Sequence, residues 1–170
     1  MGVEANALTD KGSLPPRGEG QGGGHVFETE RNISLEGEEV DMKTIILIED
    51  DASSARLVRR ALERYDYQLL HAKDGERGLR IAQERQPDLI LLDLGLPDVE
   101  GQTLAAMIKG MPELASIPLV AVTAWPAYTA ERMARAYGCD GYISKPISPR
   151  DFPAQIAVYL GVETDEQPQT

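Results

Sequence analysis

The chain has 170 residues, of which 42% are hydrophobic and 26% charged, and its formal net charge is −11. This length suits one domain with a full hydrophobic core and is short for two. Residues 43–160 carry 14 Lys and Arg against 16 Asp and Glu, so this part is nearly neutral and lacks the basic cluster that direct binding to nucleic acid requires.

Cysteine usage and hydropathy bear on the cellular compartment. Cys139 is the only cysteine, so the chain cannot form an intramolecular disulfide. The sequence has neither a long apolar span nor the apolar core of a signal peptide, so we expect no membrane insertion. A reducing cytoplasm is the location that fits these features best.

The two ends of the chain are predicted to be tails. Residues 1–42 contain 8 of the 16 glycines and few large apolar side chains, so they are predicted to form a disordered, acidic, Gly-rich extension. Met42 also resembles a natural start, and the codons of residues 38–40 can spell a ribosome-binding site, so residues 1–41 are hypothetically an untranslated leader. Residues 161–170 are expected to be a polar acidic tail.

Between the tails, strand-like and helix-like segments alternate. We expect strands near residues 44–48, 67–71, 88–92, 117–122 and 141–144, and helices near 52–65, 75–85, 99–110, 127–137 and 149–160. The first, third and fourth strand segments are almost wholly apolar, which is typical of parallel strands buried on both faces. The second is weaker and suits an edge of the sheet. The alternation predicts an α/β fold built of βαβ units.

Several residues are predicted to begin or end these helices. Asp51 is expected to be a loop or capping charge before the first helix, and Pro126 to start the fourth. Gly110 and Gly138 are expected to end the third and fourth helices. Ser148 and Pro149 are predicted to be the N-cap and first helical position of the fifth.

Polar residues follow four of the predicted strands. They are Glu49 with Asp50, Asp93, Thr123 and Lys145. Because the carboxyl ends of parallel strands meet at one edge of a sheet, these residues should lie together where α/β proteins bind ligands. Three neighbouring carboxylates repel one another unless a cation lies among them, and oxygen ligands without His or Cys favour Mg²⁺.

This set of side chains predicts phosphoryl-transfer chemistry. A carboxylate can attack phosphorus to form an acyl phosphate while a metal and an ammonium neutralise charge on the transferring group. Asp93 is the candidate nucleophile and Lys145 the candidate ammonium. The Thr123 hydroxyl can donate to a phosphoryl oxygen, and movement of the helix after it would turn the chemical event into a conformational one.

The motifs around these residues resemble those of a response-regulator receiver domain, in the order and at the separations usual for that family. The matching segments are 45–51, 87–94, 96–98, 122–124 and 144–146. The resemblance spans residues 43–160. It implies a doubly wound (βα)5, flavodoxin-like three-layer sandwich with parallel strand order 2-1-3-4-5. Only ten residues follow Leu160, so we expect a stand-alone, CheY-like receiver.

The resemblance also implies roles in two-component signalling. Asp93 would accept a phosphoryl group from a histidine kinase or a histidine phosphotransfer protein. Glu49, Asp50 and Asp93, with the backbone carbonyl of Gly95, would serve a Mg²⁺ ion. The protein would then be a switch with phosphorylation and dephosphorylation chemistry at Asp93 only, rather than an enzyme.

Further positions match the family's switch and lifetime residues. Thr123 and Lys145 would engage the phosphoryl group, and the bond from Lys145 to Pro146 is commonly cis. Tyr142 resembles the aromatic that turns inward as Thr123 moves, altering the surface of the fourth helix, fifth strand and fifth helix, where an unknown partner would bind. Gly95 and Trp125 depart from common choices and would modulate the lifetime of the phosphoryl group.

Alternative functions and structural interpretations remain open at this stage. A phosphohydrolase would normally carry Asp-x-Asp, whereas Gly95 stands two residues after Asp93. A phosphorylation-independent adaptor with the same fold would not need the complete set of site residues. Tyr142 could be an ordinary strand aromatic. His71 and Cys139 have no partners at ligand spacing, so we expect no metal site there.

Overall fold

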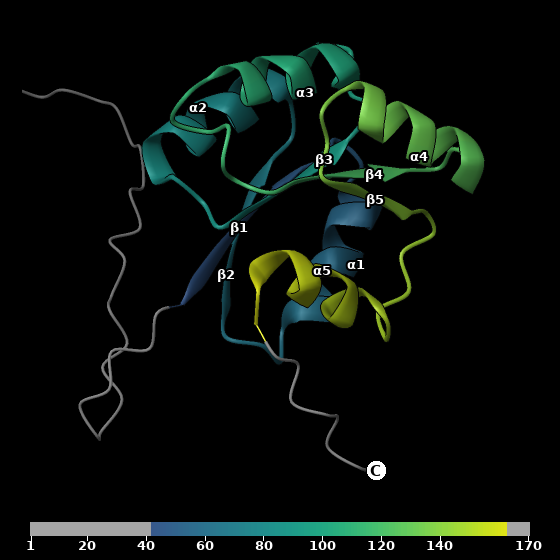
Figure 1. The fold of residues 1–170 in the computed structure, drawn as a ribbon. Helices are drawn as coiled ribbons and strands as arrows, with labels where there is room; N and C mark the ends of the chain where they lie inside the picture. The colour runs from purple at the N-terminus through teal and green to yellow at the C-terminus, as the bar shows by residue number, and fades with distance from the viewer. Residues whose placement is uncertain (1–41, 163–170) are drawn as a thin grey trace, which may run out of the picture. The chain divides into compact units, whose positions relative to one another are not determined.

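The computed structural model describes residues 42–162, which form a five-stranded parallel sheet (Figure 1). The strands are β1 (Lys43–Ile48), β2 (Tyr67–Ala72), β3 (Leu89–Asp93), β4 (Leu119–Thr123) and β5 (Gly141–Ser144). Their order is β2-β1-β3-β4-β5, and every neighbouring pair is parallel. The predicted strand order is therefore confirmed, and the less apolar second strand lies at an edge as expected.

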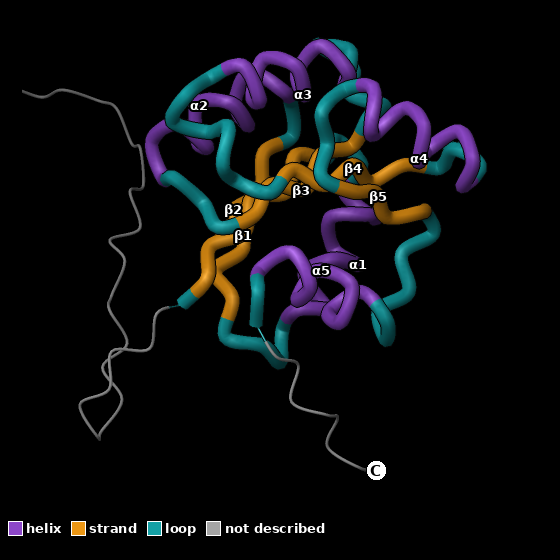
Figure 2. Tube along the Cα trace, in the orientation of Figure 1, coloured by secondary structure: helices purple, strands orange, loops and turns teal. Residues whose placement is uncertain are grey.

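Five helices cover the two faces of the sheet. They are α1 (Ala52–Leu62), α2 (Gly75–Arg85), α3 (Gly101–Gly110), α4 (Ala127–Ala136) and α5 (Phe152–Leu160). Helices α2, α3 and α4 lie on one face, and α1 and α5 lie on the other, as Figure 2 shows. This arrangement confirms the three-layer α/β sandwich. Among the described residues, no helix is both long and apolar enough to cross a bilayer.

Each face of the sheet has its own hydrophobic core because successive strand residues point to opposite sides. Ile46 and Ile48 of β1 belong to the cluster under α2, α3 and α4, whereas Ile45 and Leu47 belong to the cluster under α1 and α5. Strands β3 and β4 are buried along their whole length. This two-sided burial explains why their sequences are continuous apolar runs rather than alternating ones.

Four of the predicted helix-end residues behave as expected. Asp51 caps α1, and its carboxylate accepts the backbone N–H of Ser54 at 2.7 Å. Pro126 is the N-cap residue of α4, and Gly110 is the last residue of α3. Gly138 follows α4 with a φ of +77°, a left-handed conformation that glycine adopts without steric cost.

The predicted start of the fifth helix is wrong. Helix α5 begins at Phe152 with Asp151 as its N-cap, and the proline in its first turn is Pro153 rather than Pro149. The Ser148 hydroxyl does not cap the helix because it donates to the Asp151 carboxylate at 2.7 Å. Residues 148–151 form a separate turn in which the Ser148 carbonyl accepts the N–H of Phe152 at 2.9 Å.

Three other boundaries differ from the predicted ones by two or three residues. Helix α1 ends at Leu62, α3 begins at Gly101, and β4 begins at Leu119. The later start of α3 follows from the loop before it, where Asp98 accepts hydrogen bonds from the first residues of α2. The predictions for residues 1–41 and for most of the 161–170 tail concern residues outside the described part of the chain.

Candidate functional site

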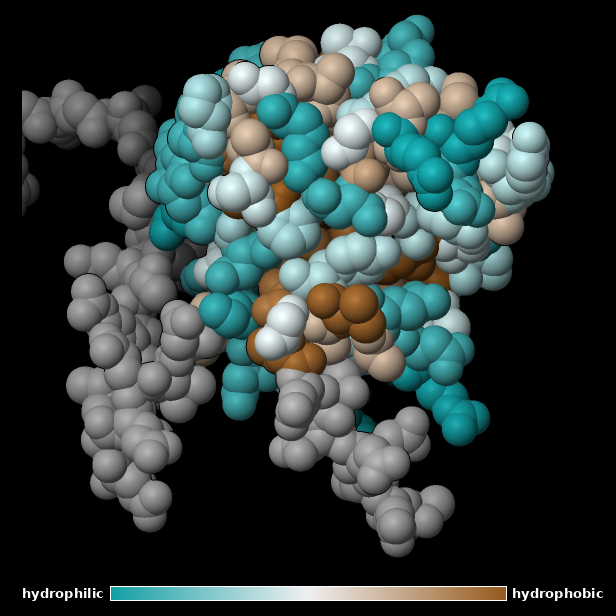
Figure 3. Space-filling view, in the orientation of Figure 1, coloured by the Kyte–Doolittle hydropathy of each residue, from teal (hydrophilic) through white to brown (hydrophobic). Residues whose placement is uncertain are grey.

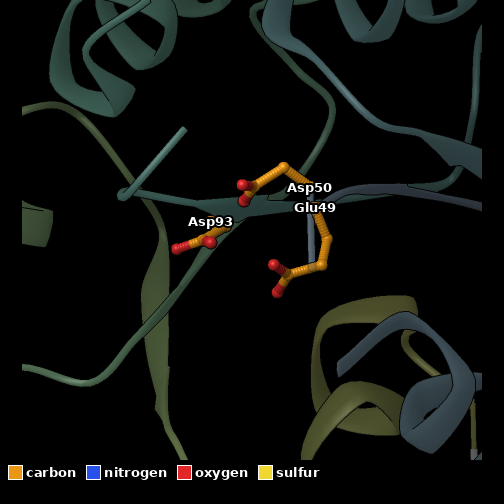
Figure 4. Close-up of side chains that lie close together, drawn as sticks. All are labelled: Glu49, Asp50 and Asp93. Carbon is orange, nitrogen blue, oxygen red and sulfur yellow. The ribbon is translucent and has the colours of Figure 1, made fainter. Parts of the chain in front are cut away.

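Three carboxylates lie together where β1 and β3 end. Figure 4 shows Glu49 and Asp50 just after β1, beside Asp93 at the end of β3. One oxygen from each of the three lies within 4.8 Å of the others. Glu49 is 1% exposed and Asp93 8%, whereas Asp50 is open to solvent. The predicted gathering of these acids at the carboxyl edge of the sheet is therefore observed.

Lys145 provides the positive charge opposite these acids. It follows β5, and its Nζ lies 2.7 Å from Oε2 of Glu49 and 3.2 Å from Oδ2 of Asp93. The Lys145 N–H also donates to the Thr123 carbonyl at 2.8 Å, which extends the pairing of β4 and β5 by one residue. The bond from Lys145 to Pro146 is cis, as the resemblance implied.

Burial and charge shift the protonation equilibria of this pair. Burial raises the pKa of Glu49, and the nearby Asp93 charge adds to that effect, while hydrogen bonds from Lys145 and Asp51 oppose it. Burial alone would lower the pKa of Lys145, but the Glu49 and Asp93 carboxylates more than compensate and raise it. The ammonium therefore stays charged at neutral pH.

The residues present fit a divalent cation. Three carboxylates face a single ammonium, which leaves the cluster with excess negative charge. Glu49 Oε2 is buried, and the Lys145 ammonium is its one partner among the described residues. Carboxylate oxygens with no imidazole or thiolate among them are the donor set that Mg²⁺ prefers.

The residues next to Asp93 and Thr123 shape the remaining sides of the site. The Gly95 N–H donates to Asp93 Oδ1 at 2.9 Å. Thr123 is buried, and its Oγ1 accepts the Trp125 N–H at 3.2 Å. Asp93 pairs with Val122 in the sheet, so Thr123 lies one position further along the neighbouring strand. Gly95 therefore contacts the carboxylate cluster directly, whereas Thr123 lies at the end of the neighbouring strand and contacts Trp125.

The predicted switch aromatic lies away from this cluster, on β5. Tyr142 is half-buried and packs against the core under α2, α3 and α4. It also lines a cavity of about 290 Å³ shared with α4 and α5, whose walls include Arg135 and Tyr159. A Cβ at Gly141 would overlap the Tyr159 hydroxyl, so a larger residue would require the Tyr159 side chain to shift.

Two contacts near the site were not predicted from the sequence. His71 Nε2 lies 2.8 Å from the Glu49 carbonyl oxygen, whereas the sequence indicated only that His71 lacks partners at metal-ligand spacing. Asp98 accepts the Gly75 N–H at 2.9 and 3.0 Å and so caps α2 from the loop after β3. The position of His71 near the end of β2 could have indicated that it lies at the same sheet edge, but nothing in the sequence marks the carbonyl that it contacts.

Comparisons with known proteins agree with this fold and site. The family model of the response regulator receiver domain matches residues 45–157. The polar-differentiation response regulator DivK of Brucella anthropi is 39% identical over 119 residues, which cover 70% of this chain and 97% of that protein. The chain therefore belongs to the response-regulator receiver family.

Solved structures of related proteins show the same architecture. The CheY-like receiver domain protein of Methanospirillum hungatei JF-1 is 27% identical, with a TM-score of 0.64, and the match covers 71% of this chain and 94% of that one. The Mn²⁺-bound form of response regulator Rcp1 is 30% identical, with a TM-score of 0.60, and the match covers 75% and 99% of the two chains. The doubly wound fold is thus that of CheY-like receivers.

Proposed function

We propose that this protein is a phosphorylation-dependent switch of a cytoplasmic two-component system, with Asp93 as the phosphoacceptor. The observation that carries the proposal is the position of Lys145, whose ammonium lies within 3.2 Å of both Glu49 and Asp93 at the edge where Asp50 and Thr123 also lie. Phosphoryl transfer to a carboxylate needs this concentration of opposite charges around the nucleophile.

In the proposed reaction, Asp93 receives the phosphoryl group from a phosphohistidine of a kinase or phosphotransfer protein. A carboxylate oxygen attacks phosphorus and forms the C–O–P linkage of an acyl phosphate. The P–N bond breaks, and its electron pair stays on the imidazole nitrogen. Lys145 would neutralise charge on the phosphoryl oxygens, and the Thr123 hydroxyl would donate a hydrogen bond to one of them.

Glu49, Asp50 and Asp93, with the carbonyl of Gly95, would hold Mg²⁺ in this site. A bound ion would supply positive charge against the oxygens of the transferring phosphoryl group. Buried Glu49 Oε2, which faces only the Lys145 ammonium among the described residues, and the excess of carboxylates over ammonium groups support this assignment. A divalent cation in the related Rcp1 structure supports it as well.

The surface formed by α4, β5 and α5 would carry the signal to a downstream protein. Thr123 would turn from the Trp125 N–H toward the phosphoryl group, and Tyr142 would fill the space that Thr123 leaves. Exposed apolar side chains support a docking role for this surface: Tyr128 of α4 is 76% exposed and Val158 of α5 78%. Hydrophobic residues gather over α5 in Figure 3.

The proposal is tested by intact-mass analysis after incubation with acetyl phosphate and Mg²⁺. We expect one phosphate adduct on the wild-type chain and none on Asp93→Ala or in EDTA. Asp51→Asn is the matched control, because it removes a neighbouring carboxylate that only caps α1 and leaves an asparagine, which also caps helices. That variant should keep the adduct.

A wild-type chain that gains no adduct would favour the alternative of a phosphorylation-independent, receiver-like adaptor. An adduct that persists in Asp93→Ala would assign the phosphoacceptor to another residue. Either result would overturn the proposal, whereas loss of the adduct in both Asp93→Ala and EDTA would support the nucleophile and the metal requirement together.

A further inference from the structure

The backbone carbonyl of Glu49 is left without a strand partner. The Glu49 N–H donates to the Ala72 carbonyl at 2.9 Å, which is the last backbone bond between β1 and β2. Continued parallel pairing would bring the N–H of Asp74 to the Glu49 carbonyl. Asp74 instead caps α2, so this carbonyl accepts no backbone hydrogen bond from the described residues.

The His71 side chain takes the place of that missing donor. Its Nε2 lies 2.8 Å from the Glu49 oxygen. A carbonyl can only accept, so Nε2 carries the hydrogen. His71 pairs with Leu47 in the sheet, and Tyr67 and Leu69, which share its face of β2, pack on the α1 and α5 side. The imidazole therefore reaches the end of β1 from the side of the sheet that α1 and α5 cover.

Asp50 depends on its backbone for its position. Glu49 is held through its side chain, because Oε1 accepts the Asp51 N–H at 3.0 Å and Oε2 faces Lys145. The Asp50 carboxylate makes no hydrogen bond or ion pair with the residues described between 42 and 162. Because the peptide group is planar, fixing the Glu49 carbonyl also fixes the direction in which the chain enters Asp50.

We propose that His71 is a positioning residue for the divalent-cation site: its Nε2–H holds the Glu49–Asp50 peptide in the orientation that keeps the Asp50 carboxylate beside Asp93. This inference rests on the proposed function, because it presupposes that these acids bind Mg²⁺. His71 itself is not a ligand, and it acts only through the peptide that it contacts.

Variants of His71 separate positioning from a purely structural role. His71→Phe keeps a ring and His71→Val suits a strand, but neither has a donor. His71→Gln places an amide nitrogen near the former Nε2 and can restore the hydrogen bond. Lys109→Met is the stability control: Lys109 Nζ bonds the Asp140 carboxylate and the Ile117 carbonyl at the opposite edge of the sheet, at 2.6 and 3.0 Å.

The experiment is a Mg²⁺ titration of the full-length chain by calorimetry, with the fluorescence of the single tryptophan, Trp125, as a second readout. We expect His71→Phe and His71→Val to weaken Mg²⁺ affinity about tenfold, the lower end of outer-shell effects. His71→Gln should bind close to wild type. Lys109→Met should lower the unfolding midpoint without changing Mg²⁺ affinity.

Wild-type affinity in folded His71→Phe or His71→Val would overturn the inference, and so would Mg²⁺ affinities that simply follow stability, with Lys109→Met weakened as well. If one donorless variant does not fold, the other decides. A wild-type chain that binds no Mg²⁺ would overturn the proposed function and this inference together. A chain that binds Mg²⁺ and is phosphorylated on Asp93, yet is indifferent to His71, would overturn this inference alone.

Discussion

The open space beside Asp93 at Gly95 bears on how long a phosphoryl group would survive. A Cβ at this position would lie 3.5 Å from Asp93 Oδ1, an ordinary van der Waals distance, so a side chain fits without strain. Gly95→Asn should shield the acyl phosphate from water and slow its loss about threefold, which corresponds to less than one kcal/mol of barrier. The decay of the phosphate adduct measured by intact mass checks this.

A matched glycine at the end of α3 provides the control for that measurement. A Cβ at Gly110 would meet no atom within 4 Å, so Gly110→Asn makes the same chemical change far from the site. Its adduct should decay at the wild-type rate. Mg²⁺ affinity should persist in both variants, and an unchanged lifetime in Gly95→Asn would contradict the expected shielding.

The acids and the lysine of the site could be predicted because each follows a recognisable strand. Glu49, Asp93 and Lys145 are charged residues at the ends of strand segments. In a parallel sheet such strand ends converge at one edge. The contact between His71 and the Glu49 carbonyl could not be predicted in the same way. It depends on where β2 stops pairing, and a backbone carbonyl carries no signal in the sequence.

Among the helices, α2 is the one that takes its N-terminal hydrogen bonds from a distant loop as well as from its own cap. The Asp98 carboxylate accepts the N–H groups of Gly75 and Glu76, and the hydrogen bond from Gly75 lowers the pKa of Asp98. The folded state therefore favours the ionised carboxylate more than the unfolded chain does. This contribution to stability is present above the unfolded pKa of about 3.9 and is lost as the pH falls through the lower folded value.

Asp98→Asn should lower the free energy of unfolding by up to about 1 kcal/mol at pH 7, because the amide keeps an acceptor oxygen but loses the negative charge at the N-terminus of α2. The difference from wild type should be the same at pH 5 and should shrink below about pH 4. Urea unfolding in EDTA measures it without a metal contribution. Asp66→Asn, which removes an exposed carboxylate, should cost little at any pH, and a pH-independent cost for Asp98→Asn would count against the charge-based explanation.

The element boundaries show where sequence patterns stop being sufficient. Apolar runs indicated β1, β3 and β4, because burial on both faces of a parallel sheet imposes that pattern. The starts of α3 and α5 were misplaced because side-chain hydrogen bonds decide them, one long-range and one local. Asp98 is held by the N-terminus of α2, and Ser148 donates to Asp151 instead of capping α5.

At the scale of the whole molecule, we expect the charges of the site to change the free energy of unfolding. Lys145→Met would leave buried Glu49 facing Asp93 without a counter-charge, so in EDTA we expect a loss of about 2 kcal/mol in the free energy of unfolding. Mg²⁺ at a hundredfold excess over its Kd should restore about 2.7 kcal/mol. Urea titrations with and without Mg²⁺ measure both quantities.

Lys145→Arg keeps the charge and is the control for that experiment. It should lose less stability in EDTA than Lys145→Met. With one ammonium fewer competing for the carboxylates, Lys145→Met should also bind Mg²⁺ at least as tightly as wild type. Wild-type stability of Lys145→Met in EDTA would contradict the view that this ion pair offsets the burial of Glu49.

The two loops that border Asp93 and Thr123 differ in the hydrogen bonds that hold them. The loop after β3 is fastened at Asp98 to the start of α2 by three backbone N–H contacts. Among the described residues, the loop after β4 has one side-chain hydrogen bond beside the site, the 3.2 Å contact from the Trp125 N–H to Thr123 Oγ1. A hydroxyl that turned toward a phosphoryl group would give up that hydrogen bond. A structural change that begins at the site would then spread toward α4, while the loop held by Asp98 stayed in place.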